Sequence, residues 1–177
     1  MDPGIQFAEL LAYNADETSR WKRWFSEHPA ALDPPCDVAG AGTVRKLVFH
    51  IFAAELSFGN RVLGLPRPNF EILPTGTLDE LFAISEEARG KFQEFLANST
   101  PEDWARVEPL GFGDFKASRR KMVAQAVLHS VHHRGQLATF LRQQGFEQGW
   151  IHDFILSKVI EEELRPAGFD APLGRAG

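Results

Sequence analysis

Cysteine is almost absent from this sequence, because Cys36 is the only one among 177 residues. No disulfide can form within the chain, and the preceding Pro34 and Pro35 indicate a loop rather than a thiolate metal site. We therefore expect a reducing, cytoplasmic environment.

Long hydrophobic runs are also missing. The most apolar stretch, from Leu47 to Leu56, has about half the length that a membrane-spanning helix requires, and it contains His50 and Glu55. The N-terminal segment shows no basic region followed by an apolar run, so no signal peptide is predicted. We expect a soluble protein that does not use a membrane as a partner.

The chain has no excess of positive charge. Its formal net charge is -5 and its pI is near 5.7, whereas nucleic-acid binding requires clustered lysine and arginine in excess. No nucleic-acid partner is expected, and a small-molecule substrate is favoured. The length and the 44% hydrophobic fraction predict a single domain over residues 1–165, followed by a loosely ordered tail over 166–177.

Helical periodicity dominates what is present. The fold class is predicted to be all-α, a four-helix bundle with an additional C-terminal helix. Thr43 is the expected N-cap of the second helix, and Gly145 the C-cap of the fourth. Residues 100–115 alternate apolar and polar residues, as a short hairpin or an extended crossover does. The five predicted helices cover residues 5–28, 43–64, 78–97, 117–144 and 150–164.

The segment VLHSVHHRGQLATFLRQQG, residues 127–145, contains a histidine pair. His129 and His133 are four residues apart, so both lie on one helix face and can chelate one ion. His132 competes with His133, but it is rotated by about 100° around the helix and is less well directed. Apolar residues share the face of the pair, which predicts that the pair points into the bundle. These apolar residues are Met122, Ala126, Leu137 and Phe140.

His50 is the expected third ligand. It lies in the apolar second helix, where an unpaired imidazole is costly, although a histidine there is by itself more often a hydrogen-bonded core residue. Together with the chelating pair it favours a divalent metal site with an open coordination position. Zinc is the first expectation, and nickel, iron or manganese are alternatives, because imidazole discriminates poorly between them.

These residues also carry a resemblance to a known family. The sequence resembles the DinB family, of the DinB/YfiT-like metalloenzyme superfamily, from the Tyr13-Asn14 region through Gly145. The resemblance implies a bundle, often dimeric, with a three-histidine metal site, and we expect a homodimer. Some relatives look like transferases or isomerases that use a low-molecular-weight thiol. The matching residues are His50, His129, His133, Arg134, Gly135, Gln136 and the LRQQG of 141–145.

Roles can also be predicted for several residues near the histidines in the sequence. Gln136 shares the histidine face, so we expect it either to hydrogen-bond a metal-bound water or ligand, or only to pack. Arg134 is expected to point outward, and Gly135 to permit close helix approach. Glu55 is a weak candidate for a base, because it is rotated by about 140° from His50.

The first functional hypothesis is a metal-dependent enzyme that activates a small thiol or water for transfer or hydrolysis. The alternative is a non-catalytic metal-binding stress or interaction protein, and a third reading is a plain bundle with core histidines. If three imidazoles hold the ion, acidification through about pH 6.5 should release it as they protonate.

Overall fold

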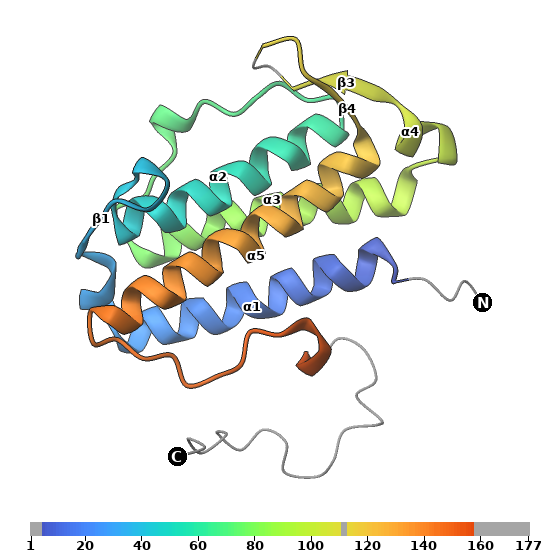
Figure 1. Ribbon diagram of the computed structural model, residues 1–177. Helices are drawn as coiled ribbons and strands as arrows, with labels where there is room; N and C mark the ends of the chain where they lie inside the picture. Colours follow the sequence, from blue (N-terminus) through green and yellow to red (C-terminus); the bar gives the residue numbers. More distant parts are fainter. Residues whose placement is uncertain (1–4, 111–112, 158–177) are drawn as a thin grey trace.

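Four long helices form the body of the computed structural model, which describes residues 5–110 and 113–157 (Figure 1). Two of them, α2 and α1, each pack against both α3 and α5, so the four form a ring of neighbours. The predicted all-α four-helix bundle is confirmed, and the predicted helix ends agree to within two residues. The long helices are α1 (Phe7–Glu27), α2 (Val44–Val62), α3 (Leu78–Asn98) and α5 (Arg119–Gln143).

Side-chain caps fix where three of these helices begin. Thr43 caps α2 as predicted, because its hydroxyl accepts a hydrogen bond from the amide of Lys46 at 3.3 Å. Thr77 and Glu80 form a reciprocal capping box at the start of α3, and Ser118 caps α5. Within the described residues, none of the helices combines the length and the apolarity needed to cross a bilayer.

The interior of the bundle contains two apolar clusters with a polar layer between them. On α1, Asn14 and Thr18 separate the two clusters, and on α5 Ser130 and Arg134 do so. The larger cluster includes Phe25, Leu47, Phe82, Leu137 and Leu141, and the smaller one includes Val62, Phe92, Phe95, Met122 and Val123.

Two small antiparallel ribbons connect the helices. The hairpin alternative for the region before α5 is confirmed, with Val107 opposite Ser118. The short helix α4 was not predicted. Its N-cap is Thr100, whose side chain and that of Asp103 form a capping box. The ribbons and this helix are β1 (Pro35–Cys36), β2 (Gly42–Thr43), α4 (Pro101–Ala105), β3 (Val107–Pro109) and β4 (Lys116–Ser118).

The predicted fifth helix does not begin at Trp150. The chain instead returns along α1 as an extended segment with one 3-10 turn, Phe154–Leu156 (Figure 1). Its polar side chains are bound to α1, because Nδ1 of His152 lies 2.6 Å from a carboxylate oxygen of Glu17. The indole of Trp150 lies against that of Trp21 on α1. The rest of the predicted helix and the predicted tail lie outside the described residues.

Candidate metal centre

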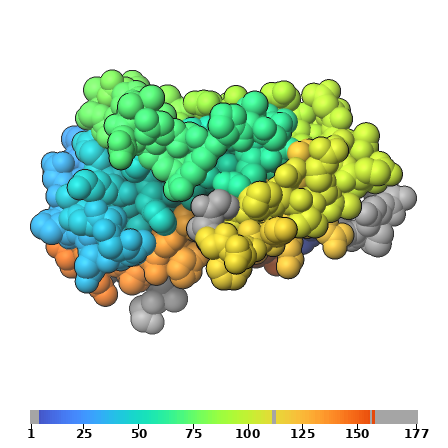
Figure 2. All heavy atoms as spheres, turned by 90° about the horizontal axis from the view of Figure 1, so that it is seen from above, coloured from blue at the N-terminus to red at the C-terminus, as the bar shows by residue number. Residues whose placement is uncertain are grey.

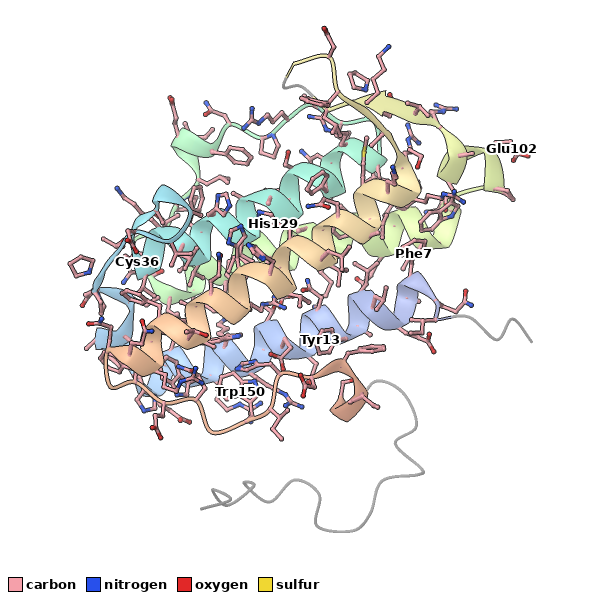
Figure 3. The ribbon with its side chains drawn as sticks, viewed as in Figure 1. Phe7, Tyr13, Cys36, Glu102, His129 and Trp150 are labelled. Carbon is pink, nitrogen blue, oxygen red and sulfur yellow. The ribbon has the colours of Figure 1, made fainter. Side chains whose placement is uncertain are left out.

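Three histidine side chains meet between α2 and α5. His50 comes from α2, and His129 and His133 come from successive turns of α5; each offers one ring nitrogen, and these nitrogens all lie within 4.8 Å of one another. Nε2 of His129 is 3.2 Å from Nε2 of His50. Figure 3 labels His129 at the junction of the two helices. The structure thus brings together the three predicted histidines, while His132 is exposed and outside the group.

The spacing of the rings fits a first-row metal ion. With metal–nitrogen bonds of about 2.0–2.1 Å, two imidazole nitrogens are about 3.4 Å apart on a tetrahedral ion and about 3.0 Å apart at right angles on an octahedral one. The 3.2 Å separation of His50 and His129 lies between these values, so it suits either geometry. The same distance also allows one ring to donate a hydrogen bond to the other. The three-histidine group can therefore hold an ion, without selecting which metal.

Gln136 orients one of the three rings. Oε1 of Gln136 lies 2.7 Å from Nδ1 of His133, and an amide oxygen only accepts hydrogen bonds. Nδ1 of His133 therefore carries the proton, and Nε2 is left with a free lone pair. Gln136 was expected either to hydrogen-bond a metal-bound water or ligand, or only to pack. In the structure it contacts a ring nitrogen of His133. Nδ1 of His129, by contrast, is buried and has no hydrogen-bond partner among the described residues.

The histidines lie at the rim of the bundle. His133 is buried and His129 is half-buried, but His50 is exposed. The expectation that His50 lies within the apolar interior is therefore wrong, because the face of α2 that carries it borders a surface cleft instead of a neighbouring helix.

Burial and mutual proximity keep these imidazoles neutral. The pKa of His129 is lowered to about 4, first by burial and then by the charges of His133 and His50. Partial burial of the ring, followed by the charge of His133, also lowers the pKa of His50, although the residue as a whole is exposed. Burial lowers the pKa of His133 as well. Neutral imidazole is the form that binds a metal, so the cluster is held ready for an ion at neutral pH.

A cleft of about 860 Å³ opens beside His50 and His129. One face of α2 lines it, together with residues from the loop before α2 and from the loop over 63–77. In Figure 2, α2 (teal) is visible between the blue-to-cyan residues before it, the green loop after it and the yellow hairpin. A molecule bound in this cleft would lie beside His50 and His129, which both line it.

Arg134 points into the bundle and not outward as expected. Its side chain is 5% exposed; Nη1 donates to Oδ1 of Asn14 at 2.7 Å, and Nη2 donates to the hydroxyl of Thr18 at 2.5 Å. Position 134 is rotated by about 100° from His133, which turns its side chain toward α1. The neighbouring Gly135 does not permit close approach, since a Cβ there would meet no atom within 4 Å.

Glu55 lies at the centre of the same polar layer. Its carboxylate accepts hydrogen bonds from Asn14, Ser85 and Ser130 at 2.8, 2.7 and 2.6 Å, and Nη2 of Arg134 lies 3.5 Å away. Hydrogen-bond partners on α1, α3 and α5 thus compensate for the burial of this carboxylate. The sequence suggested Glu55 only as a weak candidate for a base. A signal was present in the sequence, because these polar residues occur at helical spacing on apolar helix faces.

A comparison with protein families gives a match over most of the chain. The DinB family matches residues 3–163, a span that includes the four long helices and all three histidines. No curated protein is similar enough to this chain to count as a relative. Since the match extends over most of the sequence, the chain belongs to the DinB family.

Proposed function

We propose that this protein is a metal-dependent enzyme in which His50, His129 and His133 hold one divalent ion. A small thiol or water would be activated at the open position of the ion. The thiol would then be transferred to a small-molecule substrate, or the water would hydrolyse it. The observation that supports this proposal is the cluster of three ring nitrogens within 4.8 Å beside a cleft of about 860 Å³. A closed structural site has no need of such a cleft.

The chemistry follows from the set of donors. A divalent ion bound by three neutral imidazoles keeps its full charge, so it lowers the pKa of a coordinated thiol or water and polarises a carbonyl. Gln136 holds the proton on Nδ1 of His133, so Nε2 of this ring would be free to bind the ion. A thiol is the first candidate because of the resemblance to thiol-dependent relatives. Zinc as the metal and a homodimeric assembly belong to the same proposal.

The first test is metal content. The protein is purified without a metal-affinity tag, and bound metal is measured by mass spectrometry for the wild type, His133→Ala and His132→Ala. We expect one ion per chain in the wild type and in His132→Ala, and loss of the ion in His133→Ala. A wild type that binds no metal after incubation with zinc, nickel, iron or manganese would sink the proposal.

The second test separates an enzyme from a metal-binding protein without turnover. Conjugation of 1-chloro-2,4-dinitrobenzene to a panel of small thiols is followed with the metal-loaded and the chelator-treated protein. Turnover that depends on the metal and is lost in His133→Ala supports the enzyme. Equal rates with both forms for every thiol count against thiol transfer and favour the non-catalytic alternative.

A further inference from the structure

The cleft beside the histidine site is long, and its floor is one face of α2. Arg45 and Arg61 both line it, near the two ends of this helix. They are sixteen residues apart on the helix, which corresponds to about 24 Å. Between them the floor includes three small side chains, Ala53, Ala54 and Ser57, which leave room above the middle of the helix. The lining residues of α2 recur at helical spacing, and they are Arg45, Lys46, Phe49, His50, Ala53, Ala54, Ser57, Phe58 and Arg61.

Positive charge collects along this cleft, although the chain as a whole carries a net charge of -5. Glu71 is the single acidic residue among its described lining residues. The cationic lining residues make no ion pair with any acidic side chain that the structure describes. Unpaired cations around a hollow attract a negatively charged ligand. These four residues are Arg45, Lys46, Arg61 and Arg67.

Two of the arginines are positioned by backbone carbonyl groups. Nη1 of Arg45 donates to the carbonyl oxygens of Thr75 and Gly76, both at 3.3 Å, and Nη1 of Arg61 donates to that of Pro109. A carbonyl group does not neutralise the guanidinium charge, and the other N–H groups of each arginine remain available to a ligand. Cations held in place in this way lose less conformational entropy when a ligand binds.

Aromatic side chains give the same cleft apolar surfaces. Phe49 on α2 meets the ring of Phe70 edge to face, with ring centroids 6.4 Å apart. Arg67 lies over the ring of Phe70, with its guanidinium carbon 5.0 Å from the ring centroid. Phe58 lines the cleft farther along α2. The lining therefore suits a molecule with an apolar portion and an acidic group.

We propose that this cleft is a binding site for an organic carboxylate, and that Lys46 holds the carboxylate next to the metal centre. Lys46 precedes His50 by four residues, so its side chain lies one helical turn away on the same face. Lys46 is exposed and forms no ion pair with an acidic side chain in the described part of the chain, so its ammonium group can reach a group on a molecule whose other end meets the ion. The assignment of this molecule as a substrate rests on the proposed function, but the binding of the carboxylate does not require the metal.

The test uses two probes of the same shape and different charge, 2-naphthylacetate and 2-(2-naphthyl)ethanol. Binding to the chelator-treated full-length protein is measured by titration calorimetry, so that no ion can coordinate the carboxylate. We expect the carboxylate to bind about tenfold more tightly than the alcohol, and the difference to shrink as salt is added. Equal affinities for the two probes, or no binding of either, would overturn the proposal.

Two variants remove positive charge from exposed positions, so folding should be preserved in both. They are Lys46→Gln and the double variant that combines Lys46→Gln with Arg67→Gln. We expect each to weaken binding of the carboxylate by about threefold to tenfold and to leave the alcohol unchanged. Lys46→Arg should retain the preference. Arg142→Gln is the matched control, since Arg142 is exposed in the last turn of α5 and does not line the cleft. An equal loss in this control would mean that only the net charge matters, and would also overturn the proposal.

A kinetic readout distinguishes failure of this proposal from failure of the proposed function. With the metal-loaded enzyme, Lys46→Gln should raise the KM for mercaptosuccinate and leave the KM for thioglycerol unchanged. If neither thiol is turned over while the naphthyl carboxylate still binds through Lys46, the proposed reaction fails and the carboxylate site stands. If both thiols are turned over with the same change in KM, the carboxylate site fails and the reaction stands.

Discussion

Arg134 on α5 and Glu55 on α2 form an ion pair across the interior of the bundle, with 3.5 Å between Nη2 and Oε1. Both side chains are almost completely buried. Asn14 connects them a second time, because its amide donates to Glu55 and its oxygen accepts from Arg134. The pair is therefore part of a closed polar network that leaves neither charge isolated.

Replacing one member of this pair should destabilise the protein strongly. We expect Arg134→Met to lower the free energy of unfolding by about 3–5 kcal/mol, because it leaves the charge of Glu55 buried without its partner. The measurement is urea unfolding followed by circular dichroism. Arg89→Met is the control, since Arg89 pairs with Glu86 on the surface of α3, and its loss should cost at most about 1 kcal/mol. Equal effects of the two substitutions would contradict the role assigned to the buried network.

Gln136 should contribute to metal affinity without contacting the ion. We expect Gln136→Ala to weaken zinc binding by about 10- to 100-fold, because the ring of His133 loses the acceptor that fixes its proton and its orientation. Gln136→Glu keeps an acceptor at this position and should retain most of the affinity. Competition with a chromophoric chelator measures both. An unchanged dissociation constant for zinc in Gln136→Ala would show that the contact with His133 does not contribute to metal affinity.

The metal-free protein should lose stability in mild acid. In the unfolded chain a histidine takes up its proton near pH 6.5, whereas the pKa of His129 in the folded protein is lowered to about 4. The contribution of this residue is therefore fully present above pH 6.5, and it is lost as the pH falls toward 4, because the unfolded state binds the proton first. Urea unfolding between pH 7 and 4 should show a shallower loss in His129→Ala than in the wild type.

The lowered pKa values also change the expected release of metal. Protons compete for the histidines only when the rings can be protonated, so the midpoint of release should lie below the pH of about 6.5 expected for ordinary imidazoles. Equilibrium dialysis at a series of pH values measures the retained metal. A midpoint above pH 6.5 would contradict the lowered pKa values of His50, His129 and His133.

Two glycines in helices should respond in opposite ways to alanine. A Cβ on Gly59 in α2 would lie 3.0 Å from Cβ of Lys91 and 3.3 Å from the carbonyl oxygen of Ala88, so Gly59→Ala should destabilise the α2–α3 contact by about 1–3 kcal/mol. Gly90 in α3 has no atom within 4 Å of such a Cβ, so Gly90→Ala should stabilise the helix by about 0.5–1 kcal/mol. Thermal unfolding compares the two. A stabilised Gly59→Ala would mean that the two helices are free to move apart.

The meeting of the three histidines could be predicted from the sequence because most of its signal is local. The interval between His129 and His133 places both on one helix face whatever the rest of the fold does. The exposure of His50 could not be predicted, since an apolar helix has the same periodicity whether a given face meets another helix or borders a cleft. The predicted outward orientation of Arg134 was also wrong, because its partners Asn14 and Thr18 come from a helix more than a hundred residues away.

The segment after α5 shows a second limit of periodicity. Its apolar residues are spaced as in a helix, but Trp150 and His152 are used against Trp21 and Glu17 of α1. An extended chain places both side chains on α1 and satisfies the buried carboxylate of Glu17, which a single sequence does not reveal.

The polar layer also sets the alignment of α2 with α5. On α5, His129 is followed by Ser130, and His133 by Arg134, so each of these two clustered histidines adjoins a residue that binds Glu55. Sliding α5 by one turn would separate its histidines from His50, and it would move Arg134 out of the polar layer, so that the carboxylate of Glu55 loses both Arg134 and Ser130. Apolar contacts alone tolerate such slippage far better. The buried charges therefore fix the register of α5 against α2, and the meeting of the three histidines depends on that register.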